Sequence, residues 1–312
     1  MRRLVCGRIA SSFARVSDGL ANRATDRGTQ SHSLARCNQS LGLTILHRCF
    51  RSRVHLLCCA VLALTMLPFT VLAEVNTLAR FRMGEADGGI SGNTVTNEAD
   101  SSGNGFHLDV VTGNQVWSSD TPSTAGSTLP LGVSSLSVRF TAPASSYRNA
   151  GGQTNSQVTA LSDNVGIEAW VKSDDLHFSA IIVHNGRSML PPLSGFGLVQ
   201  LAPGTFGNTN TVYAGQVAGA FVGSATASTN EWTHLALVRD SAAFGGWRFF
   251  VNGTLNGTNS APGIAASGTF EMGAGTAVPG GALPFNGKLD EVRVFSFSSG
   301  QFSTNDLNVT PP

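Results

Sequence analysis

Residues 231–258 read EWTHLALVRDSAAFGGWRFFVNGTLNGT, and they contain three segments that predict a β-meander. Trp232 to Arg239 has apolar side chains at both even and odd positions, a pattern typical of a strand buried on both faces. Trp247 to Val251 is a second, aromatic strand. Asn252-Gly253 follows it at once, and both residue types tolerate the positive φ of a tight hairpin turn. Thr254 then begins a third strand, so we expect an all-β protein built around this meander.

Short strands are also predicted along most of the chain on either side of the meander. The segments are bounded by Gly, Asn or Pro, and no helical pattern alternates with them. The chain holds 36 Gly and only 12% charged residues, which favours many turns and short strands over helices. These features predict a two-sheet antiparallel sandwich. The predicted strands are 77–83, 136–140, 165–172, 180–184, 195–201, 211–217, 220–227, 268–272 and 288–297, and a short helical turn is expected within 299–307.

Six segments, taken in their order along the chain, resemble one known family. They are FRMGE (81–85), DSSGNGFHL (100–108), VGIEAWVK (165–172), WTHLALVRD (232–240), GGWRFFVNG (245–253) and GKLDEVRVF (287–295). Together they resemble concanavalin A-like jelly-roll domains of the laminin G type, over about residues 78–307. The resemblance implies a two-sheet jelly roll that binds glycans or surface proteins, often with a structural Ca²⁺ at the rim of the sandwich.

The first 73 residues differ from the rest in charge and hydropathy. They hold ten arginines and two aspartates, a formal charge of +8, whereas the remaining ten basic and seventeen acidic residues give −7. Residues 54–73, VHLLCCAVLALTMLPFTVLA, are mostly apolar and predict a secretory signal that is cleaved after Ala73. An uncleaved membrane anchor is the alternative, because about 18 apolar residues can span a bilayer. We expect a leader over 1–73, a jelly-roll domain over 74–307 and a short tail over 308–312, in a secreted, periplasmic or surface-displayed protein.

The charge and cysteine content of the predicted mature chain exclude several partners. An acidic body is a poor nucleic-acid binder, because phosphates require Lys and Arg to neutralise them. Membrane contact is expected only through the leader, if it is not cleaved. All five cysteines lie within residues 1–73, so the body is expected to use neither disulfides nor thiolate ligands.

The loop from Asp100 to Gly105, DSSGNG, is the predicted cation site. It offers an Asp, an Asn and backbone carbonyls, which are the hard oxygen ligands that Ca²⁺ prefers. Asp290 lies in the last predicted strand, which commonly neighbours the first strand in such sandwiches. The resemblance supports Asp100 and Asp290 as ligands, assisted by Asn104 and Gly105. The alternative is that Asp100 and Asn104 form an Asx-turn and that Asp290 makes a buried hydrogen bond.

No residue is assigned a catalytic role. A glycosidase needs two carboxylates about 5–9 Å apart, and jelly-roll glucanases carry such acids alternating along one strand, as in ExDxxE. The chain has no such run, and beyond residue 73 it has neither a GxSxG elbow nor an HExxH motif. Glu168 and His234 lie within predicted strands, and we interpret both as packed structural groups.

Exposed aromatic rings are the best sequence indicators of sugar binding, because apolar sugar faces stack on them. Trp117 and Tyr147 lie in polar, loop-like stretches and are the predicted stacking residues. The tryptophans at 170, 232 and 247 lie in predicted strands and are expected in the core.

Three functions are compatible with this sequence. The first is a non-enzymatic module that binds a carbohydrate or an extracellular or surface protein. The second is a polysaccharide hydrolase or lyase on the same fold, which the absence of paired acids disfavours. The third is a structural protein of a cell envelope. The oligomeric state is open, and fold-level resemblance alone does not select among the functions.

Overall fold

The computed structural model describes residues 75–112, 115–141, 146–149, 157–186, 192–274 and 283–310. The predicted leader over 1–73 and its apolar segment 54–73 lie outside the described residues. Within the described ranges, no helix is both long enough and apolar enough to cross a bilayer.

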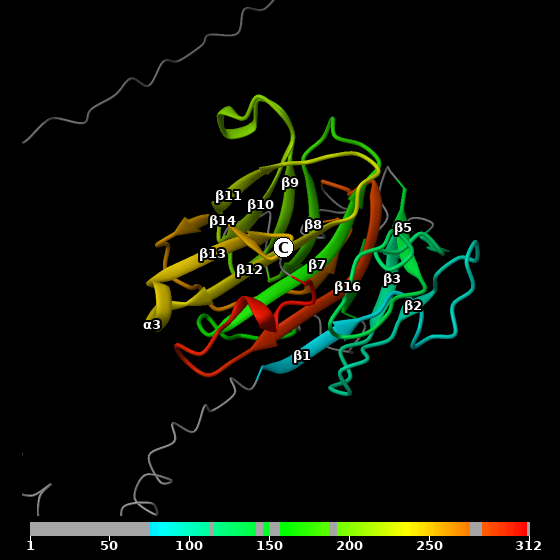
Figure 1. The fold of residues 1–312 in the computed structure, drawn as a ribbon, viewed down its shortest axis with the longest axis horizontal. Helices are drawn as coiled ribbons and strands as arrows, with labels where there is room; N and C mark the ends of the chain where they lie inside the picture. The colour runs from blue at the N-terminus through cyan, green and yellow to red at the C-terminus, as the bar shows by residue number, and fades with distance from the viewer. Residues whose placement is uncertain are drawn as a thin grey trace, which may run out of the picture. The chain divides into compact units, whose positions relative to one another are not determined.

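Two antiparallel sheets make up this part of the chain (Figure 1). In hydrogen-bonded order, sheet A contains β14 (Thr254–Asn259), β13 (Gly246–Val251), β12 (Thr233–Asp240), β7 (Val165–Ser173), β16 (Gly287–Ser296), β5 (Ser137–Phe140) and β4 (Val116–Ser118), with β1 (Asn76–Phe81) also paired to β16. Sheet B contains β11 (Ala220–Thr226), β10 (Val212–Val217), β9 (Phe196–Leu201), β8 (Ala180–Asn185), β15 (Phe270–Met272), β6 (Ser146–Asn149), β3 (Leu108–Thr112) and β2 (Asn97–Glu98). The only described helical turns are η2 (Thr205–Gly207), α3 (Ser241–Phe244) and η3 (Thr304–Asp306). The predicted all-β jelly-roll sandwich is confirmed.

The meander predicted from residues 231–258 is β12–β13–β14. β12 is buried on both faces, as its apolar pattern indicates, because the C-terminal segment covers its outer face. Asn252 and Gly253 form the turn after β13 with φ of 49° and 76°, so both adopt the left-handed conformation that the Asn-Gly pair predicts.

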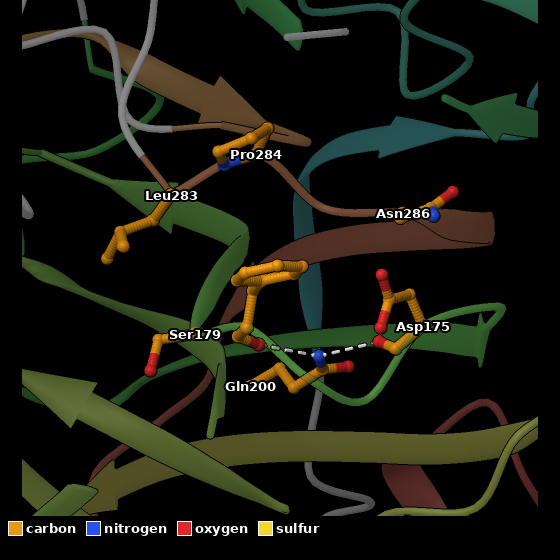
Figure 2. A pocket seen from close by; sticks show the side chains of 7 residues that line it. Asp175, Ser179, Gln200, Leu283, Pro284 and Asn286 are labelled. Atoms are coloured by element: carbon orange, nitrogen blue, oxygen red, sulfur yellow. Dashed lines mark hydrogen bonds between the residues drawn. The ribbon is translucent and has the colours of Figure 1, made fainter. Parts of the chain in front are cut away.

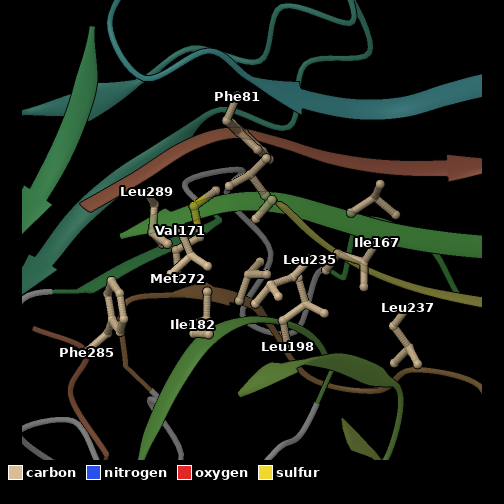
Figure 3. Packing of buried hydrophobic residues seen from close by; sticks show 14 of the residues in the cluster. Phe81, Ile167, Val171, Ile182, Leu198, Leu235, Leu237, Met272, Phe285 and Leu289 are labelled. Carbon is tan, nitrogen blue, oxygen red and sulfur yellow. The ribbon is translucent and has the colours of Figure 1, made fainter. Parts of the chain in front are cut away.

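The main core lies between the two sheets. Phe81 of β1 and Phe270 of β15 stack across it with ring centroids 5.5 Å apart. Figure 3 shows the interdigitated side chains of both sheets, including Phe81, Ile167, Val171, Leu235, Leu237 and Leu289 from sheet A and Ile182, Leu198 and Met272 from sheet B. The described part of the chain contains no Cys, so this apolar burial holds the sandwich together without cross-links.

A bulge in β16 places the two acids of the LDEV segment. The register with β7 shifts between Asp290 and Arg293, and Glu291 has a φ of 48°. Along the other side of β16, residues 287–289 pair with β5 whereas residues 292–296 pair with β1. The bulge therefore marks the point at which β16 changes partner, and the expected pairing of the first and last strands is confirmed.

A second apolar cluster covers the outer face of sheet A. Phe297, Leu307 and Val309 of the C-terminal segment pack on Trp170 and Phe250. Figure 1 shows this segment, in red, crossing the strands of sheet A. Trp170 donates a hydrogen bond from Nε1 to Asn308 O at 3.0 Å, which satisfies the polar end of the buried ring.

The strands that the sequence did not indicate are β2, β3, β4 and β6. Each has two to five residues, which is too short to show a clear period. β6 lies within the stretch interpreted as a loose polar loop, and it pairs with both β3 and β15.

Candidate functional site

The two predicted stacking residues do not lie in loops. Trp117 lies in β4 and is 6% exposed, so its ring is part of the core and not a platform for a sugar. Gly84 and Gly89 lie against this ring, and a Cβ at either position would approach it to 2.9 Å. Tyr147 lies in β6, opposite Val110 and Met272, and its side chain is outside the described part of the structure.

The Asp100 carboxylate is occupied by hydrogen bonds from the chain. Oδ1 accepts from Arg80 N at 3.0 Å and Ser102 N at 2.9 Å, and Oδ2 accepts from Ser102 Oγ at 2.8 Å and Phe106 N at 3.0 Å. Burial works to raise the pKa of Asp100, but these hydrogen bonds outweigh it and the pKa lies below its usual value. The hydrogen bond from Ser102 N to Asp100 Oδ1 is that of an Asx-turn, which was the alternative to a calcium site at this loop.

Asn104 and Gly105 complete the same turn. Asn104 donates from Nδ2 to Thr77 O and Leu78 O, at 3.2 Å and 2.9 Å, and Gly105 has a φ of 82°. The loop from Asp100 to Gly105 is thereby fastened to β1.

Asp290 belongs to a different network. It is fully buried and accepts a hydrogen bond from Ser134 Oγ at 2.5 Å, and among the described residues it shares no hydrogen-bond partner with Asp100. Burial and the neighbouring Glu291 charge raise its pKa well above the usual value, so a neutral carboxyl is favoured.

In this structure the predicted calcium ligands are engaged within the protein itself. The Asp100 oxygens already accept four donors, and Asp290 is favoured in its neutral form. Across the described ranges, no group of three or more His, Cys, Asp or Glu is placed to hold a metal. Calcium binding at Asp100, Asn104, Gly105 and Asp290 therefore stays a prediction.

The buried acid of β7 has a structural environment. Glu168 Oε1 accepts from Arg293 Nε at 2.5 Å, and Oε2 accepts from Asn308 N and contacts His234 Nε2, both at 2.9 Å. Burial opposes the ionised form, but the Arg293 charge and the His234 contact lower the pKa of Glu168 to about 2. Glu168 and His234 are completely buried, as expected for packed groups, and neither faces solvent.

A pocket of about 320 Å³ lies at one end of the sandwich (Figure 2). One wall is the loop between β7 and β8, and the other is the segment that precedes β16. Backbone hydrogen bonds of 2.9 Å join the walls, from Asp174 N to Asn286 O and from Ile181 N to Leu283 O. The residues that line it are Asp175, Phe178, Ser179, Gln200, Leu283, Pro284 and Asn286.

The pocket combines apolar side chains with a few polar groups. Phe178 is 68% exposed and is the one described aromatic residue with a large exposed side chain. Leu283 and Pro284 add apolar surface on the opposite wall, and Asp175 and Asn286 supply a carboxylate and an amide. An apolar cleft with a small number of convergent polar groups is typical of ligand sites.

The charge of the pocket comes from Asp175. Its Oδ1 accepts from His177 N at 2.8 Å and contacts His177 Nδ1 at 2.7 Å. These contacts with His177, backbone first, lower the pKa of Asp175, and the Asn286 side chain lowers it further. Asp175 is therefore an ionised acceptor at neutral pH.

No feature of the sequence alone predicts this pocket. Its residues come from three segments that are far apart in the chain, and none of them forms a motif. A single Phe within a short polar segment, DDLHFS over 174–179, is the one signal in the sequence that points to it.

The fold and this rim pocket define an antiparallel jelly-roll sandwich with a small ligand-sized cleft. Residues 145–299 match the family model described as the concanavalin A-like lectin/glucanases superfamily. This match confirms the predicted resemblance over that part of the chain. A search of the curated proteins finds no match to this chain.

Several solved structures are similar to this chain at low identity. Domain 4 of AbnA, an extracellular arabinanase from Geobacillus stearothermophilus in complex with arabinotriose, is 20% identical, with 76% of this chain and 98% of that chain covered and a TM-score of 0.42. A Trypanosoma rangeli sialidase in complex with sialic acid is 11% identical and has a TM-score of 0.46, and the match covers 73% of this chain and 31% of the sialidase. The receptor-binding domain of botulinum neurotoxin D is 15% identical and has a TM-score of 0.43, and the match covers 75% of this chain and 51% of the toxin chain. These likenesses add nothing to the fold that the paired strands show.

Proposed function

We propose that this protein is a secreted or surface-displayed, non-enzymatic module that binds carbohydrate, with the rim pocket as its sugar site. The observation that carries the proposal is the exposed Phe178 beside the ionised Asp175 and the Asn286 amide. An aromatic face can stack on a sugar ring, while a carboxylate and an amide can hydrogen bond to its hydroxyls. The superfamily description, which names lectins and glucanases, is consistent with this chemistry.

The size and charge of the pocket define the class of ligand. A volume of about 320 Å³ is near the lower end of the roughly 300–1,000 Å³ typical of ligand pockets. It suits one or two sugar rings at a time. The Asp175 carboxylate repels anionic ligands, so the proposed ligand is a neutral sugar and not a uronic or sialic acid.

Hydrolysis is the less favoured function. A glycosidase needs two carboxylates that flank the scissile bond. Asp175 is the one carboxylate among the described residues that line the pocket. The buried acids Glu168 and Asp290 hydrogen bond within the protein and do not line it.

The test is a glycan array of neutral and acidic oligosaccharides, followed by calorimetry on the best neutral ligand. We expect saturable binding that Phe178→Ala weakens by up to about tenfold, because an aromatic contact contributes about 0.5–1.5 kcal/mol. Asp175→Asn should weaken binding less and relax the discrimination against acidic sugars.

Ile90→Ala is the matched control, because Ile90 is 65% exposed and does not line the pocket. Equal affinity of the wild type and Phe178→Ala would show that the sugar binds elsewhere. Absence of saturable binding would favour the structural alternative, and release of new reducing ends from a polysaccharide would favour the enzyme.

A further inference from the structure

Gln200 of β9 forms the inner side of the pocket, yet its amide faces the protein. Nε2 donates to Asp175 O and Phe178 O, both at 2.9 Å, and Oε1 accepts from Ser173 Oγ at 2.7 Å. Figure 2 shows the two donated hydrogen bonds as dashed lines. An amide nitrogen carries two hydrogens, so both are engaged by the loop between β7 and β8. Gln200 therefore has no donor left for a ligand.

A buried hydroxyl pair holds the Gln200 amide in this orientation. Ser173 Oγ lies 2.8 Å from Tyr213 OH, and both residues are completely buried. Ser173 ends β7 in sheet A, whereas Gln200 and Tyr213 belong to β9 and β10 of sheet B. The chain of hydrogen bonds thus crosses the core between the sheets and ends at the loop.

The loop is held at a third carbonyl as well. Thr211 Oγ1 donates to Leu176 O, so Asp175, Leu176 and Phe178 all direct their carbonyl oxygens to groups of sheet B or its edge. Without these anchors the six residues 174–179 would have to be ordered when a ligand binds. Ordering a loop costs free energy that is subtracted from the affinity.

We propose that Gln200 is a positioning residue, which holds the loop 174–179 in the conformation that presents Phe178 and Asp175 to the ligand. The inference rests on the proposed function of the pocket, and it extends that function to a residue that need not touch the sugar. If the loop becomes mobile, only the fraction of molecules in the correct conformation can bind, and the apparent Kd rises in inverse proportion to that fraction.

The test compares Gln200→Met, which keeps the side-chain length but removes the donors, with the wild type. Hydrogen exchange of a peptide that covers residues 174–179 is measured without ligand, and the binding kinetics are measured with the neutral oligosaccharide. We expect exchange at least tenfold faster and an affinity about tenfold lower. The loss should lie mainly in the association rate, because the bound ligand itself holds the loop once the complex has formed.

A second pair of variants distinguishes a local effect on the loop 174–179 from a general loss of stability. Thr211→Val removes the hydrogen bond to Leu176 O, and Thr121→Val removes a comparable buried bond to Ser134 O in another loop. We expect Thr211→Val to act like a weaker Gln200→Met, and Thr121→Val to leave loop exchange and affinity unchanged.

The inference is overturned if Gln200→Met leaves the exchange of 174–179 unchanged, or if exchange accelerates while the association rate does not change. A Gln200→Met loss confined to the dissociation rate would also overturn it, because that result indicates direct contact with the sugar. If the wild type binds no oligosaccharide, the proposed function fails, while the exchange data still decide whether Gln200 orders the loop.

Discussion

Two buried glutamates show how the same residue type takes opposite charge states. Glu98 accepts hydrogen bonds only from backbone groups, from Met83 N at 2.6 Å and from Gly84, and no cation among the described residues pairs with it. Burial, reinforced by the charge of Asp87, raises its pKa well above the usual value. Glu168 is equally buried, but Arg293 and His234 lower its pKa to about 2. The difference is the presence of a cationic partner and of sufficient donors.

The state of Glu98 predicts a pH dependence of stability that Glu98→Gln should remove. Because the folded state raises the pKa, the contribution of the neutral carboxyl is fully present below its unfolded pKa, near 4.5. That contribution is lost as the pH rises through the folded pKa. The free energy of unfolding of the wild type should therefore fall relative to Glu98→Gln above pH 4.5, by at most about 1.4 kcal/mol per pH unit.

Urea unfolding of both proteins between pH 4 and pH 8 provides the measurement. A constant difference between the unfolding free energies of the two proteins is consistent with the prediction, because the amide introduced by Glu98→Gln places different donors in the same buried site. Parallel curves over the whole range would contradict the assigned charge state.

At the scale of elements, the Glu168 carboxylate joins three strands and the C-terminal segment. Glu168 belongs to β7, His234 to β12 and Arg293 to β16, and Asn308 follows η3. Arg293 also donates from Nη2 to Asp306 O. These contacts fasten the C-terminal segment to the centre of sheet A.

Glu168→Gln should destabilise the protein by about 3–5 kcal/mol, because it leaves the buried Arg293 charge unpaired. The pKa of about 2 adds a pH signature. Since the folded pKa lies below the unfolded one, this stabilisation is present above about pH 4.5 and is lost as the pH falls towards 2. The free energy of unfolding of the wild type should therefore approach that of Glu168→Gln as the pH falls from about 4.5 towards 2.

Chemical unfolding at pH 3, 5 and 7 tests this expectation, with the exposed Glu231→Gln as the control that should stay within about 0.5 kcal/mol of the wild type. A Glu168→Gln protein as stable as the wild type at pH 7 would show that the cluster contributes nothing to the fold.

At the scale of the whole molecule, the two outer faces of the sandwich are not equivalent. The C-terminal segment covers sheet A with apolar side chains, whereas a smaller cluster of Ile181, Val199, Leu201, Val212 and Ala214 lies on sheet B beside Leu283 of the pocket. The C-terminal segment is therefore part of the core structure, although its described residues, 297–310, form no strand.

Deletion of residues 298–312 should expose Trp170 and Phe250 on sheet A and remove the buried Leu307 and Val309. Each fully buried apolar side chain contributes roughly 1.5–3 kcal/mol. We expect a clearly lower urea midpoint, more binding of a hydrophobic dye and a tendency to self-associate. A deletion protein that is monomeric, binds no dye and unfolds at the wild-type midpoint would contradict this role of the segment.

The long strands were predictable because each contains enough residues to show its pattern. β7, β12 and β16 have eight to ten residues with apolar side chains on both faces, and the Asn252-Gly253 pair indicates its turn by backbone preference alone. The short strands β4 and β6 contain too few residues for a period. As a result, Trp117 was assigned to a loop, although the glycine-rich segment of Gly84 and Gly89 closes over its ring.

The amino-acid sequence by itself determined the β class, the central meander and the acidic, cysteine-free body, because these follow from composition and from contacts between near neighbours in the chain. Only the tertiary structure decided which side chains meet. It satisfied Asp100 within its own turn, placed Asp290 in a separate network, and brought Asp175, Gln200 and Asn286 together at one rim. The physical reason is that the pairing of strands far apart in the sequence sets which side chains meet, and no local pattern of residues identifies the partner of such a strand.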